Sequence, residues 1–139
     1  KNILYIMKTL IEYITESSKN RRIGGTSYLE QDLYDCLRCD IEELLDEAYL
    51  LDDVNVIELW AHGSRMRGDF RPDSDIDVVV FYDGKIREDA LFNVLNEDPD
   101  RITIEGHQVD LNPVKVRNQS DINKYKQKSD KYDREKLAK

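Results

Sequence analysis

An almost uninterrupted apolar run, "IDVVVFY" at residues 76–82, constrains the fold of this chain more than any other feature. A strand that is buried on both faces has such a continuous composition, whereas a strand with one solvated face alternates between apolar and polar residues. We therefore expect residues 76–82 to form a central strand in a sheet that is flanked by helices. Asp83 and Gly84 follow it and favour a turn.

Two aspartates, Asp75 and Asp77, lie at the entrance of this buried strand, within "HGSRMRGDFRPDSDID" at residues 62–77. Alternate side chains of a strand share a face, so both carboxylates are expected to point one way and Ile76 the other. Two carboxylates this close repel each other, and without a cation one of them tends to stay protonated. A divalent cation resolves the conflict, and magnesium suits the site because it binds one or two carboxylates and completes its shell with water and phosphate oxygens.

A glycine and a serine, Gly63 and Ser64, come where a β-rich segment at residues 54–61 is expected to end. Glycine lets backbone N–H groups approach an anion closely, and a serine hydroxyl adds a donor. A helix that begins after Ser64 would add the positive end of its dipole. The pair therefore predicts a phosphate-binding turn. Three arginines nearby offer cations for the phosphates: Arg65, Arg67 and Arg71.

A third acid, Asp110, alternates with Val109 and Leu111 in "QVDLNP". If this segment is a strand beside residues 76–82, three acids face the turn and could hold two magnesium ions. One ion would bind a triphosphate, and the other would lower the pKa of an acceptor hydroxyl. No protein nucleophile is then needed, because positioning and charge stabilisation suffice. The alternative for Asp110 is an edge-strand residue without a catalytic role.

The spacing of these residues resembles a known family. Gly63 and Ser64, ten residues, then Asp75-Ile76-Asp77 form the G-S-x10-D-x-D pattern of the polymerase-β-like nucleotidyltransferase superfamily. The fuller "GSRMRGDFRPDSDIDVVV" looks like the minimal nucleotidyltransferases, and the resemblance covers about residues 40–115. It implies an α/β (α+β) nucleotidyltransferase fold, with a small mixed sheet of three to five strands, flanking helices and extra N-terminal helices.

The resemblance also implies an activity, the transfer of a nucleoside monophosphate from an NTP to an acceptor with release of pyrophosphate. AMP is the nucleotide expected first. The cofactor would be Mg²⁺, with Mn²⁺ as a substitute. The catalytic and metal-binding residues would be Asp75, Asp77 and Asp110, with Asp110 acting as ligand or base. The nucleotide-binding residues would be Gly63, Ser64, Arg67 and Ser74.

The resemblance allows several classes of acceptor. Some minimal nucleotidyltransferases are antitoxins that adenylylate a partner toxin with a HEPN domain, and others modify aminoglycosides. An alternative of another class is a catalytically weak nucleotide-binding or antitoxin-type partner-binding module on the same fold. The presence of all three acids favours the enzyme.

Two other interpretations of the acidic segment are a calcium-binding loop and a solvated turn. Asp73, Asp75 and Asp77 form D-x-D-x-D, but an EF-hand calcium loop requires glycine at Val78 and glutamate at Gly84. A solvated acidic turn without function would leave the Gly-Ser spacing as coincidence.

Charge and composition exclude several classes. A net charge of −8 disfavours stable nucleic-acid binding. The sequence has no apolar run long enough for a membrane span. The two cysteines, Cys36 and Cys39, lie within an expected helix without a second cysteine pair, so a structural role is favoured over a redox or zinc site. Two unpaired thiols fit a reducing cytoplasm.

The expected organisation is an N-terminal helix and connector at residues 1–26, a nucleotidyltransferase domain at 27–118 and a charged C-terminal helix or tail at 119–139. Residues 3–16 and 29–48 have helical periodicity, the second with a possible break near Asp40. Two short strands are expected around a turn at Glu105 and Gly106, with Pro113 ending the second strand.

Overall fold

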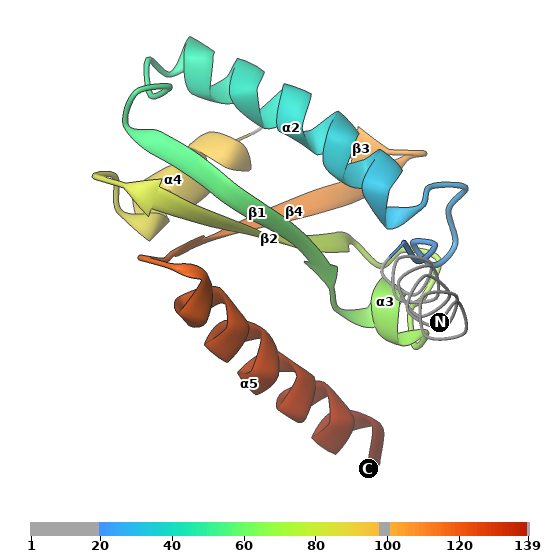
Figure 1. The fold of residues 1–139 in the computed structure, drawn as a ribbon. Helices are drawn as coiled ribbons and strands as arrows, with labels where there is room; N and C mark the ends of the chain where they lie inside the picture. Colours follow the sequence, from blue (N-terminus) through green and yellow to red (C-terminus); the bar gives the residue numbers. More distant parts are fainter. Residues whose placement is uncertain (1–19, 98–100, 139) are drawn as a thin grey trace, which may run out of the picture.

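A computed structural model describes residues 20–97 and 101–138, and the helix expected at residues 3–16 lies outside them. The described elements follow one another along the chain as α2 (Glu30–Glu47), β1 (Val54–His62), α3 (Ser64–Arg67), β2 (Ile76–Gly84), α4 (Glu88–Leu95), β3 (Thr103–Ile104), β4 (His107–Lys115) and α5 (Gln119–Ala138). Figure 1 shows a sheet with α2 on one side and α5 on the other. Within the described ranges, no helix is long and apolar enough to cross a membrane.

The four strands form one mixed sheet in the order β1-β2-β4-β3. The apolar strand β2 is central, as its composition predicts, and it runs antiparallel to β1 and parallel to β4. The expected class, a small mixed sheet flanked by helices, is confirmed. The register places His62 of β1 beside Asp77 of β2, and Asp77 beside Asp110 of β4. The end of β1 therefore meets the start of β2 at the predicted site.

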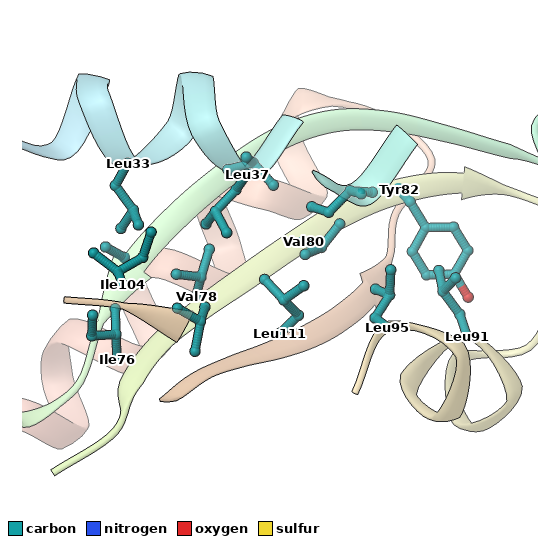
Figure 2. Close-up of a cluster of buried hydrophobic side chains, with 14 of the residues drawn as sticks. Leu33, Leu37, Ile76, Val78, Val80, Tyr82, Leu91, Leu95, Ile104 and Leu111 are labelled. Carbon is teal, nitrogen blue, oxygen red and sulfur yellow. The ribbon is translucent and has the colours of Figure 1, made fainter. Parts of the chain in front are cut away.

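The side chains of β2 alternate between two buried layers, which explains why nearly all of them are apolar. The layer under α2 and α4 is the larger one, and Figure 2 shows Leu33 and Leu37 of α2 facing the strand side chains on one side of the sheet. Its labelled members are Leu33, Leu37, Ile76, Val78, Val80, Tyr82, Leu91, Leu95, Ile104 and Leu111. The second layer joins Val79 and Phe81 of β2 to Ile122 of α5. Asp77 lies on this second face of β2, two residues before Val79, where the apolar layer begins.

Helix α2 is continuous, so the expected break near Asp40 is wrong. Leu37, Ile41 and Leu45 extend one buried stripe past that position, and burial of the stripe keeps the helix intact. The helix begins at Glu30, where the Asp32 carboxylate accepts the Leu29 backbone N–H at 3.3 Å.

The hairpin around Glu105 and Gly106 is confirmed, with φ values of 51° and 82°. Two consecutive positive φ values are typical of the tight turns that join antiparallel strands. The expectation that Pro113 ends the following strand is wrong, because β4 continues to Lys115. Among the described residues, strand β3 pairs only with His107 and Gln108. They leave one edge of β4 open at Pro113, where a missing N–H is tolerated.

The C-terminal segment forms helix α5, which packs on the sheet face that carries Asp77. Ile122 is fully buried and Tyr125 lies edge-on to Phe81, with ring centroids 5.5 Å apart. Farther along the helix, Asp133 pairs with Arg67 of α3 at 3.0 Å. Helix α5 is therefore anchored at both ends of the sheet face, and it borders the site.

Replacing Ile122 with alanine is expected to lower the free energy of unfolding by about 2–5 kcal/mol, because it leaves a cavity beneath α5. Urea denaturation followed by circular dichroism measures this change. Tyr132→Ala on the same helix is the control, because Tyr132 is 63% exposed and its truncation is expected to change stability little. Equal losses in both variants would show that α5 is not anchored through Ile122.

Candidate active site

Three aspartates gather where β2 and β4 run side by side. Asp77 and Asp110 are neighbours in the parallel register, and Asp75 immediately precedes β2. Gln108 bridges two of them: its Nε2 lies 3.4 Å from Asp75 Oδ2 and 3.2 Å from Asp110 Oδ1. The structure thus brings the two predicted acids and the predicted third acid to one place on the sheet.

The acids carry more negative charge than their neighbours balance, because among the described residues only Asp110 has an ion-pair partner, Arg101. Burial, followed by the charges of Asp110 and Asp75, raises the pKa of Asp77 to about 6. Burial also raises the pKa of Asp75, and a hydrogen bond with Asp110 and its charge add to this rise. Raised carboxyl pKa values from mutual repulsion are expected where a cation normally balances the charge.

Two of the three aspartates present carboxylate oxygens that suit a hard divalent cation. Asp75 and Asp77 supply carboxylate oxygens, and two carboxylates suffice for magnesium when water and phosphate fill its other positions. Asp110 is engaged elsewhere, in an ion pair with the guanidinium of Arg101. Accordingly, the part of the chain that the structure describes has no group of three or more acidic, histidine or cysteine side chains arranged to hold one ion.

The Gly-Ser turn lies directly against Asp77. Gly63 precedes helix α3 with a φ of 84°, a conformation that favours glycine. A methyl group on Gly63 would lie 2.5 Å from Asp77 Oδ2, so only glycine permits this approach. The short helix α3 begins at Ser64 itself, one residue earlier than the start after Ser64 that the sequence suggested. The turn and the acids therefore form one site.

Arg65 is not available as a phosphate ligand, contrary to the sequence-based expectation. Its side chain is buried, and Nε donates to the Ser74 carbonyl at 2.8 Å. Its other nitrogens contact the carbonyls of Gly24 and Pro72 at 2.8 and 3.2 Å, and His107 Nδ1 at 3.1 Å. Arg65 therefore holds together the loop that leads to Asp75.

Arg67, a predicted nucleotide ligand, lies at the site but is engaged by two carboxylates. Its Nε is 3.2 Å from Asp69, and its NH1 is 3.0 Å from Asp133 of α5. Ser74, the other predicted polar ligand, accepts the Arg71 backbone N–H at 2.8 Å and shapes the loop before Asp75. Its contact with a nucleotide remains a prediction.

A cavity of about 340 Å³ opens beside the Gly-Ser turn. Its lining includes Trp60, His62, Gly63, Arg67 and Asp133. The rings of Trp60 and His62 stack with centroids 5.2 Å apart, and burial lowers the pKa of His62. The cavity therefore joins aromatic faces and arginine to the turn, which suits a nucleotide or an acceptor group.

Three side chains of the site were not predicted from the sequence: Gln108, Arg101 and Asp133. Gln108 precedes Asp110 by two residues, so the period of a strand places both on one face. That signal was present in the sequence. Arg101 and Asp133 reach the site from outside the strands that carry the acids, and no local spacing identifies them.

The raised pKa of Asp77 predicts an unusual pH dependence of stability. The folded, metal-free protein binds a proton more tightly than the unfolded chain. Its free energy of unfolding is therefore expected to rise as the pH falls from about 6 to about 4. Asp77→Asn should reduce this dependence and stabilise the metal-free protein at neutral pH. Urea titrations in EDTA across this range measure it, and an unchanged slope in the variant would contradict the assignment.

Comparison with known proteins gives one match. Residues 39–137 match the model of a family described as a nucleotidyltransferase domain, and this span covers more than half of the chain. No curated protein and no solved structure matches the chain. The matched span includes the Gly-Ser turn, all three acids and most of α5.

Proposed function

The chain belongs to the nucleotidyltransferase domain family, within the polymerase-β-like superfamily, and we propose that it transfers AMP from ATP to an acceptor hydroxyl. The acceptor oxygen forms a bond to the α-phosphorus, and the bond from that phosphorus to the β-phosphate oxygen breaks. Pyrophosphate leaves, and the hydroxyl proton passes to solvent or to a base of the site. The observation that carries this proposal is the contact of the Gly-Ser turn with Asp77 beside Asp110.

Each part of the site has a role in the proposal. The turn at Gly63 and Ser64 binds the triphosphate, with Arg67 as a cation in the same cavity. Asp75, Asp77 and Asp110 would hold divalent metal, two ions in the nucleotide complex. Bound Mg²⁺, or Mn²⁺ in its place, neutralises phosphate charge and lowers the pKa of the acceptor hydroxyl. The chain itself contributes orientation, because it supplies no nucleophile to this reaction.

The acceptor that we propose is a hydroxyl of a protein, such as a HEPN-type toxin, and a small molecule is the other candidate. A cytoplasmic location is proposed with it, because Cys36 and Cys39 are free. Calorimetric titration with each NTP, in the presence and absence of Mg²⁺, tests the substrate. ATP is expected to bind most tightly, and only with the metal. Binding that is independent of metal would contradict the proposal.

Freeing Arg67 from its partner on α5 is expected to strengthen nucleotide binding. Asp133→Asn removes a carboxylate that competes with phosphate for the guanidinium. The affinity for Mg-ATP should rise roughly threefold to tenfold, about 1 kcal/mol. Asp130→Asn is the matched control. Asp130 lines the same cavity, and its substitution removes the same charge. An equal rise in both variants would show a general charge effect and no role for Arg67.

A further inference from the structure

Arg101 forms an ion pair with the third acid of the site, Asp110. Its guanidinium pairs with Asp110, and both side chains are mostly buried, with 21% and 32% exposed. The same Asp110 Oδ1 also receives the amide of Gln108 at 3.2 Å. Asp110 therefore has two donors from its own chain, whereas Asp75 and Asp77 have no ion-pair partner within the described ranges.

The position of Arg101 is set by neighbouring residues. Its NH1 lies 3.4 Å from the Asn96 carbonyl. Asn96 is itself fixed to β4, because its side chain donates to the Leu111 carbonyl at 2.7 Å and accepts the Leu111 N–H at 2.9 Å. Arg101 Nε is buried without a hydrogen-bond partner among the described residues, which is unfavourable for stability. The guanidinium is thus directed at Asp110 while its Nε donor stays unsatisfied.

A second set of carboxylates shares a cavity with Arg101. A cavity of about 310 Å³ is lined by Arg101 and by three acids of α2: Asp40, Glu43 and Glu47. A guanidinium that leaves Asp110 therefore has another anionic environment within the same cavity. Arg101 thus pairs with an acid of the active site and shares a cavity with the acids of α2.

We propose that Arg101 prevents Asp110 from binding metal until the nucleotide binds. The protein without nucleotide then binds one divalent ion, on Asp75 and Asp77. This inference rests on the proposed function. One divalent ion neutralises these two carboxylates, while Arg101 already neutralises the third. A nucleoside triphosphate adds negative charge to the site. This charge favours binding of a second ion at Asp110 and movement of the Arg101 guanidinium toward the acids of α2.

Counting bound Mn²⁺ by electron paramagnetic resonance tests this without any turnover. Wild type is expected to bind one ion alone and two with a non-hydrolysable ATP analogue. Arg101→Gln should bind two without nucleotide, whereas Arg101→Lys should still bind one. Arg101→Gln combined with Asp110→Asn should return to one. Arg87→Gln is the matched control, because Arg87 is exposed and pairs only with Asp89 among the described residues, and it should bind one.

Two ions on the nucleotide-free wild type, or one on Arg101→Gln, would overturn the inference. Asp110→Asn alone provides a second test if Arg101→Gln does not fold. It should bind the first ion with unchanged affinity, and a tenfold loss would show that Asp110 is already a ligand. No bound ion in the wild type would overturn the proposed metal site itself, and the inference with it. A single ion in the nucleotide complex would contradict the two-ion mechanism.

Discussion

Replacing Asp77 with asparagine is expected to lower kcat by about 10³-fold or more, equivalent to roughly 4 kcal/mol of transition-state stabilisation. Asp77 lies at the centre of the site, between the Gly-Ser turn and Asp110. Asparagine keeps the size of the side chain but removes the charge that would hold metal. The loss should therefore appear in kcat and in metal binding, and the fold should remain.

Stability separates this effect from misfolding. Because burial and neighbouring acids raise the pKa of Asp77, its ionised form is unfavourable in the metal-free protein. Asp77→Asn is therefore expected to unfold at a higher temperature than wild type in EDTA at neutral pH. A variant that is both active and bound to metal would show that Asp77 is not a ligand. Asp73→Asn, in the same loop but exposed, is the control and should retain activity.

Replacing Gly63 with alanine is expected to lower the free energy of unfolding by roughly 1–3 kcal/mol, and catalysis by about 10²-fold. The methyl group would meet Asp77 Oδ2 at 2.5 Å, and alanine is strained at the φ of 84°. The turn or the carboxylate must move, and either shift would separate the proposed phosphate-binding turn from the proposed metal ligand. Urea denaturation and steady-state kinetics measure the two effects.

Gly106→Ala separates strain from contact. Gly106 has a φ of 82°, almost equal to that of Gly63, but no atom of the described residues lies within 4 Å of the position of an added methyl group. This variant should lose stability through strain alone and keep its activity. If both glycine variants lost activity equally, the contact between Gly63 and Asp77 would have no special role.

The central strand and its acids were predictable from the sequence because their signals are local. An apolar run buried on both faces specifies the centre of a sheet, and the period of a strand places Asp75 and Asp77 on one side. The pairing of Asp110 with Asp77 needed a guess about strand order, and the register confirms it. The prediction that Pro113 ends a strand was wrong. Whether a proline ends a strand depends on whether another strand pairs at its N–H side, and this is set by the tertiary structure.

The arginines were harder to assign, because three of them lie close together in sequence but differ in environment. Arg65 is buried among carbonyl groups, and Arg67 pairs with a residue of α5. Arg101, from another loop, is the guanidinium that reaches an acid of the site. Which arginine reaches the acids depends on packing between distant segments, and spacing along the chain carries no such information.

Transfer of label from ATP tests the central claim most directly. The purified chain is incubated with Mg²⁺, a candidate acceptor and ATP that is labelled at either the α- or the γ-phosphate. Label is expected to reach the acceptor only from the α-phosphate, and to leave as pyrophosphate from the γ-phosphate, with Mg²⁺ present and Asp77 intact. Transfer of the γ-label to the acceptor, or α-label transfer that persists in EDTA, would contradict the account.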